Sequence, residues 1–160
     1  MTFTAEESRA LLYKLQNDPY NTFNLDYFNE KNPNPYEWKA VLEGTIDSIY
    51  EGGYYMIKIV FNENYPNQRP RVYFLNRIFH PHVNQSDWML DTYPLLKEND
   101  IISLLECIDN IFFNYDYNIE HAYHQEPLIL YRQNLNSFIG KAKEWVKNYA
   151  KLEDLNKFYN

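Results

Sequence analysis

The strongest local signal in the chain is a run of strand-forming residues at positions 54–61, which follows directly after a glycine pair. β-Branched and aromatic side chains dominate this run, and such residues favour a pleated, half-buried strand. Gly52 and Gly53 stand before it and allow the positive φ angles that a tight hairpin turn requires. Residues 36–42 alternate in the manner of a strand and supply the preceding partner. The chain is therefore constrained to fold around an antiparallel hairpin.

Other elements before residue 75 extend this pattern. Residues 5–16 carry apolar side chains at helical spacing, and Thr4 with Glu7 forms the sequence of a capping box. Pro33 and Pro35 forbid regular pairing and predict a loop. Residues 71–74 predict a further strand. A helix followed by an antiparallel meander is the expected first half.

The second half predicts helices at residues 101–112, 127–138 and 141–149. In the first of them the apolar side chains fall on one helical face. Neither an internal repeat nor a linker interrupts the chain. We therefore expect a single α+β domain over residues 1–160.

The charge balance limits the partners that we expect. Lys and Arg number 15 against 22 Asp and Glu, which gives a net charge of −7. An acidic protein does not attract nucleic acid or anionic membranes, so we expect neither as a partner, and no direct membrane insertion. The first residues lack the basic and apolar regions of a secretory signal. Cytoplasm is the default expectation, and an accessory subunit of an organelle such as the mitochondrion, imported by an internal signal, stays open.

The most specific motif lies at residues 79–91, called here the site segment. It contains His80-Pro81-His82, a short turn and then Met89-Leu90-Asp91. This resembles the core motif of ubiquitin-conjugating enzymes, in which His-Pro-Asn is followed by a turn and by Cys-Leu-Asp. Met89 stands where that family has its cysteine. A thioether has no proton to lose and cannot carry ubiquitin as a thioester.

Further motifs of the family recur in the same order, so that the resemblance covers about residues 5–150. It implies the ubiquitin-conjugating fold, with an N-terminal helix, a four-stranded antiparallel meander sheet and C-terminal helices. Besides the site segment, the matching positions are Trp38, Gly44, residues 50–53, Phe61, Tyr65, Pro66, Pro70, Phe74 and residues 141–150.

The chain also differs from the resembling family at other positions that have catalytic or ligase-binding roles in that family. His82 replaces the asparagine that supports the oxyanion in active members, and His121 stands where many members carry an acid that helps deprotonate the incoming lysine. Asn67 replaces the phenylalanine that inserts into a ubiquitin ligase. Together with Met89, these changes predict that the chain is not an enzyme. They also predict a vestigial site made of His80, Pro81, His82, Met89, Leu90, Asp91 and His121.

Two roles follow from this expectation. The leading hypothesis is a structural or adaptor subunit of a larger hetero-oligomeric protein assembly, since the motif is similar to that of noncatalytic variants of the fused-toes type. The alternative is a regulatory variant that binds ubiquitin or an active conjugating enzyme and steers ubiquitin chain formation. No cofactor is expected for either role.

A nucleophilic thiol or a metal site would have to come from the cysteine or the histidines of the chain. Cys107 is the only thiol, and it falls in the middle of the helix predicted from residue 101, beside its apolar face. Such cysteines are usually small buried hydrophobes rather than nucleophiles. His82 and His121 form a lower-ranked candidate zinc site, because neutral imidazoles are good zinc ligands. Against it, His80 in the resembling family is structural and bonds to the backbone, so no metal is expected.

Partner contacts are expected at four positions. Tyr65 and Asn67 match the loop that meets the ligase in the resembling family. Tyr115 and Tyr117 lie in a polar stretch, residues 114–118, where they are difficult to bury, and tyrosine is favoured at protein interfaces.

Overall fold

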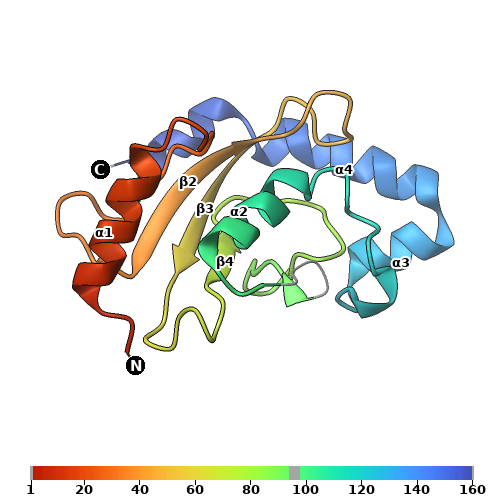
Figure 1. Ribbon diagram of the computed structural model, residues 1–160. Helices are drawn as coiled ribbons and strands as arrows, with labels where there is room; N and C mark the ends of the chain where they lie inside the picture. The colour runs from red at the N-terminus through yellow and green to blue at the C-terminus, as the bar shows by residue number, and fades with distance from the viewer. Residues whose placement is uncertain (1, 94–97, 160) are drawn as a thin grey trace.

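The computed structural model describes residues 2–93 and 98–159, and its elements follow the predicted order of helix, sheet and helices. The sheet comprises four strands, and shorter 3₁₀ turns accompany the helices (Figure 1). The elements are α1 (Ala5–Gln16), β1 (Asp26–Tyr27), β2 (Glu37–Glu43), β3 (Tyr54–Val60), β4 (Arg71–Phe74), α2 (Ile101–Asn110), η2 (Ile119–His121), α3 (Glu126–Gln133), α4 (Leu135–Tyr149) and η3 (Leu152–Phe158).

The sheet has the order β1-β2-β3-β4, and every neighbouring pair is antiparallel. Ala40 pairs with Ile57 and Ile59 pairs with Val72, which places the apolar runs of β2, β3 and β4 side by side. This confirms the predicted α+β class with a four-stranded meander. The sequence did not single out β1, because a strand of two residues is too short to show alternation.

The turn between β2 and β3 depends on a close backbone approach. The amide of Gly44 donates a hydrogen bond to the carbonyl of Gly53 across 2.7 Å. A Cβ atom on Gly44 would lie 1.8 Å from the carbonyl oxygen of Tyr50, so a larger residue cannot fit without moving the turn. Gly52 has a φ of 83°, in the region that glycine enters at little cost.

Helix α1 begins as its sequence predicts. Thr4 and Glu7 bond reciprocally, since the Glu7 amide donates to Thr4 Oγ1 and the Thr4 amide donates to Glu7 Oε1, each across 3.1 Å. The buried face of the helix carries Ser8, Leu12 and Leu15. Figure 1 shows α1 and α2 on the near side of the sheet, while the chain after α4 returns behind it.

The predicted helix at residues 127–138 is wrong in its boundaries. The structure divides this region into α3, which ends at Gln133, and α4, which begins at Leu135. Asn134 between them is extended, with φ −154° and ψ 90°, and its side-chain oxygen accepts a hydrogen bond from the Ser137 amide across 3.1 Å. An asparagine that caps the following helix cannot also continue the preceding one.

Within the described ranges, none of the helices has both the length and the apolar character needed to pass through a lipid bilayer.

Candidate functional site

The site segment, residues 79–91, follows β4 as an irregular loop that folds back on the strand. Isolated bridges join Tyr73 to Met89 and Val83 to Leu90. The Leu90 amide donates to the carbonyl of Val72 across 2.9 Å. The loop is therefore hydrogen-bonded along the edge of the sheet rather than free in solvent.

His80 is a structural residue. Its ring is fully buried, Nε2 donates to the carbonyl of Ile111 across 2.9 Å, and Nδ1 accepts the amide of His82 across 3.0 Å. Burial lowers the pKa of His80 from 6.5 to about 3, and the bond to Ile111 opposes this only in part. The imidazole is therefore neutral at ordinary pH, and the predicted bond to the backbone is confirmed.

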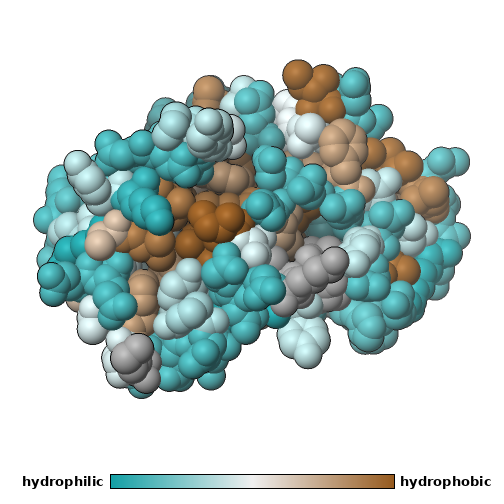
Figure 2. Space-filling model, viewed as in Figure 1, coloured by the Kyte–Doolittle hydropathy of each residue, from teal (hydrophilic) through white to brown (hydrophobic). Residues whose placement is uncertain are grey.

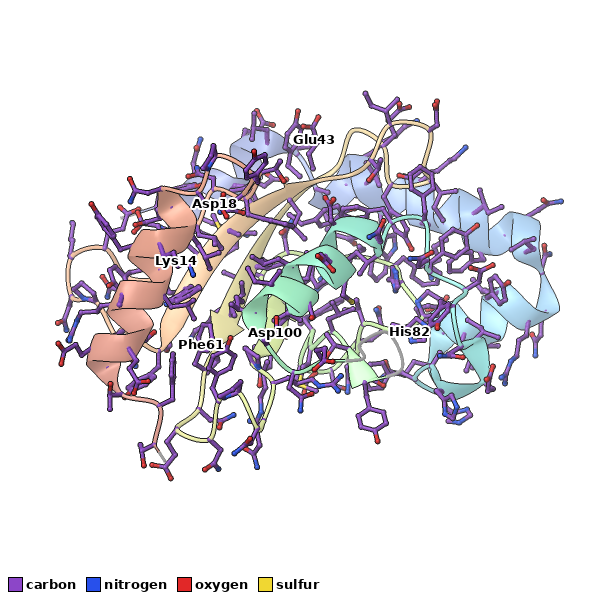
Figure 3. All side chains as sticks on the ribbon, in the orientation of Figure 1. Lys14, Asp18, Glu43, Phe61, His82 and Asp100 are labelled. Atoms are coloured by element: carbon purple, nitrogen blue, oxygen red, sulfur yellow. The ribbon has the colours of Figure 1, made fainter. Side chains whose placement is uncertain are left out.

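His82 is also buried, but only half of its hydrogen-bonding capacity is used. Nε2 donates to the carbonyl of Tyr117 across 2.5 Å, whereas Nδ1 has no partner among the described residues. Burial lowers the pKa of His82, the bond to Tyr117 and the nearby Asp91 and Asp116 raise it, and the nearby His121 lowers it further. In Figure 3 His82 lies on the α3 side of the molecule, away from α1.

His121 faces the solvent. It lies in η2 with 66% of its side chain exposed, and its Nε2 is 3.9 Å from the carboxylate of Glu120. A zinc site would need at least three grouped ligands, yet the described part of the chain holds no cluster of three His, Cys, Asp or Glu side chains suited to a metal. Because Nε2 of His82 is already bonded to Tyr117, the geometry does not support the alternative zinc site at His82 and His121.

The remaining residues of the predicted site do come together. The Asp91 amide donates to the carbonyl of His82 across 2.8 Å, and the carbonyl of Pro81 accepts the amide of Tyr123 across 3.1 Å. Met89 is half-buried, and its amide donates to Asp87 Oδ1 across 3.0 Å. Pro81, His82, Met89, Leu90 and Asp91 thus form one hydrogen-bonded loop, with His80 beneath it.

Cys107 lies in α2, as predicted, and is half-buried. Burial raises the pKa of its thiol to about 11, and the nearby Arg69 opposes this only weakly. The side chain is therefore a protonated thiol near neutral pH, which suits a small hydrophobic residue better than a nucleophile.

Two residues that hold the site segment and the chain just after it were not predicted from the sequence. Gln125 accepts the amide of Gln85 across 2.7 Å, and Arg69 donates to the carbonyl of Thr92 and to Asn99 Oδ1, each across 3.0 Å. Both residues bond to segments that are distant in the sequence, and no local sequence pattern predicts hydrogen bonds of that kind.

Comparison with known proteins identifies the family to which this fold belongs. The family model described as ubiquitin-conjugating enzyme matches residues 5–146. The chain belongs to the ubiquitin-conjugating enzyme family.

Individual relatives of the family support this assignment. Ubiquitin-conjugating enzyme E2 2 of Mycosarcoma maydis is 30% identical over 120 residues, which cover 69% of this chain and 60% of the relative. Ubiquitin-conjugating enzyme E2 2 of Debaryomyces hansenii is 31% identical over 121 residues, covering 72% of this chain and 69% of the relative. Ubiquitin conjugating enzyme E2 B of Dictyostelium discoideum is 30% identical over 121 residues, covering 72% and 78%. The chain thus spans 60% of the length of the Mycosarcoma relative.

The prediction that the chain is not an enzyme is wrong in light of these relatives. The proteins that it matches are named ubiquitin-conjugating enzymes, and the match extends over residues 5–146. The prediction rested on four substituted side chains, Met89, His82, His121 and Asn67, within a chain that otherwise matches the family. A substitution at one position describes the chemistry of that side chain, whereas family membership rests on the fold and on the matched residues together.

The predicted partner-binding residues of this family member differ in exposure. Tyr65 is half-buried against Phe3, with ring centroids 4.8 Å apart, and its hydroxyl accepts the amide of Ile101 across 2.8 Å. Tyr115 is half-buried, because its ring packs against those of Tyr50 and Phe138, and it is less exposed than Tyr117.

Asn67 and Tyr117 are the two candidates that are open to solvent. Asn67 is exposed in the loop before β4, and Tyr117 has 51% of its surface exposed. That these two residues bind a partner stays a prediction.

Proposed function

We propose that the chain acts in ubiquitin conjugation through protein contact, binding ubiquitin or an active conjugating enzyme and steering the formation of ubiquitin chains. Membership of the ubiquitin-conjugating enzyme family over residues 5–146 supports the pathway. The names of the relatives, which are ubiquitin-conjugating enzymes, support ubiquitin as the modifier.

One observation supports a role in binding a partner protein. The carbonyl of Tyr117 accepts a hydrogen bond from the buried His82, while 51% of the Tyr117 surface is exposed. The backbone of this tyrosine is thereby fixed to the site segment, and its ring is presented beside that segment. Because its backbone is already fixed, Tyr117 has only its two side-chain torsions to order on binding, which favours it as an anchor for a partner.

A second candidate role is that of an adaptor. An adaptor subunit of a hetero-oligomeric assembly, as in the fused-toes type, would use the same exposed surface for a permanent partner. A cytoplasmic location is also a proposal. Purification from native extract separates the two roles, because an adaptor would elute in a stable complex whereas a regulator would elute alone.

The test is a reconstituted reaction that contains activating enzyme, ATP, ubiquitin and an active conjugating enzyme, with and without this protein. We expect the protein to bind ubiquitin or the conjugating enzyme and to change the rate or the linkage of chain formation. We expect Tyr117→Ala to weaken that binding by about tenfold, the effect of losing about 1.4 kcal/mol of contact energy. Tyr13→Ala is the matched control, because Tyr13 on α1 is 70% exposed and is distant from the site segment in sequence.

Two results would contradict the proposal. Equal binding by wild type and by Tyr117→Ala would remove the assigned contact. An unchanged rate and linkage of chain formation when this protein is added would remove the proposed effect on the reaction.

A further inference from the structure

Two adjoining cavities lie beside α2. The first is bounded by the C-terminal end of α1 and residues 18–23, and the second by Thr22, Phe23 and the end of β2. One has a volume of about 280 Å³ and the other of about 320 Å³. Both are lined by Thr22, Phe23 and Asp109, so they form one continuous depression. We call this depression the α1–α2 groove.

The floor of the first cavity is apolar. Leu15, Phe23 and Leu105 line it, and Ile102 adds a side chain that is 49% exposed. In Figure 2 this part of the surface is an apolar patch between α1 and α2, surrounded by hydrophilic side chains. Exposed apolar surface rimmed by polar residues is typical of a binding site.

The rim of the groove is acidic. Asp18, Glu106 and Asp109 border the first cavity, and Glu43 borders the second. None of these four carboxylates forms an ion pair with a described residue. Figure 3 shows Asp18 just after the end of α1 and Glu43 at the end of β2, with Lys14 on α1.

No Lys, Arg or His of the described ranges lines either cavity. The groove therefore combines an apolar floor with a negative rim that the protein itself does not neutralise. A partner that fills it must bring both apolar side chains and positive charge, since burying the floor beside unpaired carboxylates would otherwise cost free energy.

We propose that the α1–α2 groove docks a basic amphipathic segment of a partner protein. Large apolar side chains of the segment occupy the first cavity, and Lys or Arg side chains beside them pair with Asp18, Glu106 and Asp109. Asp109 borders both cavities, so it meets the segment where the first cavity opens into the second. This surface lies on the α1 side of the molecule and is separate from Tyr117, so its failure would leave the proposed function untouched.

The probe is a fluorescein-labelled helical peptide with leucines on one face and lysines beside them, titrated with the protein and followed by fluorescence anisotropy. Two matched peptides replace the leucines with alanine or the lysines with glutamate. We expect the parent peptide to bind and both control peptides to bind at least about tenfold more weakly, because the groove requires apolar anchors and positive charge together.

Charge-matched protein variants locate the binding. The triple variant Asp18→Asn, Glu106→Gln, Asp109→Asn removes the rim charges, whereas Glu6→Gln, Glu144→Gln, Glu153→Gln removes three exposed acids elsewhere and leaves the same net charge. We expect the first variant to weaken binding by about tenfold and the second by less than about twofold. Ile102→Ser, at an exposed position, should weaken binding by about fivefold without changing the unfolding midpoint.

An equal loss in both triple variants would mean that the acidic protein attracts any cationic peptide, and the proposal would be overturned. Tight binding of the alanine peptide would overturn it as well, because the apolar floor would then have no role.

Discussion

The phenol of Tyr50 donates a hydrogen bond to the carbonyl of Phe79 across 2.7 Å, and both residues are buried. The Tyr50 ring also stacks on the ring of His80, with centroids 5.7 Å apart. The turn between β2 and β3 therefore supports the first residues of the site segment from beneath. Two motifs that are separate in the sequence act as one structural unit.

Replacing Tyr50 with phenylalanine should destabilise the protein by about 1–3 kcal/mol, because it leaves the buried carbonyl of Phe79 without a donor. Urea unfolding of wild type and variant measures this difference. Tyr54→Phe is the control, since the Tyr54 hydroxyl bonds the exposed Glu43 and should contribute less than about 0.5 kcal/mol. Equal stability of Tyr50→Phe and wild type would show that the hydrogen bond is replaced by water.

Acid should destabilise the fold through His80. Burial lowers its pKa from 6.5 to about 3, so between these values the unfolded chain binds a proton that the folded chain does not. The contribution of His80 is therefore complete above pH 6.5 and falls as the pH drops toward 3, at about 1.4 kcal/mol per pH unit.

Two measurements check the pH dependence. Urea unfolding at several pH values between 7.5 and 4 should give a steeper loss of stability for wild type than for His80→Gln. In NMR spectra the ring of His80 should keep the shifts of a neutral imidazole down to about pH 5, more than one unit below its unperturbed pKa. Parallel stability curves, or a ring that titrates near pH 6, would contradict the assignment.

Local signals explain which parts of the fold the sequence could predict. The Thr4–Glu7 capping box and the run at 54–61 depend on neighbours within a few residues, and both appear as expected. The contacts of the site depend on distant residues. His82 meets Tyr117 across 35 positions and Gln85 meets Gln125 across 40, and a single sequence holds no pattern for such pairs.

The partial burial of Tyr115 shows a second reason why the sequence alone could not predict every contact. Its neighbours in the chain are polar, which predicts exposure, yet α4 brings Phe138 against its ring, with centroids 5.5 Å apart. The split at Asn134 has a similar cause, because the residue can continue one helix or cap the next, and only packing decides between the two. Residue type sets the available options, and tertiary contact selects among them.

Cys107 should react slowly with alkylating agents. Burial raises the pKa of its thiol from 9.0 to about 11, so the thiolate fraction near pH 7.5 is about 100-fold lower than in a free cysteine. Iodoacetamide labelling followed by mass spectrometry should therefore be at least about 100-fold slower than for a free cysteine peptide, and urea should remove the difference. Cys107→Ser should leave binding in the reconstituted reaction unchanged. Rapid labelling of the folded protein would contradict this description of the thiol.

The ion pair between Lys39 and Glu30 lies against Tyr159 in the C-terminal segment, and removing one partner should destabilise the fold. Lys39 in β2 is only 4% exposed, its Nζ lies 3.2 Å from the carboxylate of Glu30, and the Tyr159 ring centroid is 4.5 Å from Nζ. Glu30→Gln would leave a buried ammonium without its counter-ion and should cost about 1–2 kcal/mol, a value kept low because Glu30 is 44% exposed.

Lys39→Met should be within about 1 kcal/mol of wild type, since an apolar side chain of similar length removes the charge that needed a partner. Glu153→Gln, at an exposed acid of η3, is the matched control for the loss of one negative charge. Urea unfolding of all three variants at the same pH makes the comparison. If Lys39→Met costs as much as Glu30→Gln, the ion pair itself, rather than the avoidance of an unpaired charge, stabilises the contact between β2 and the C-terminal segment.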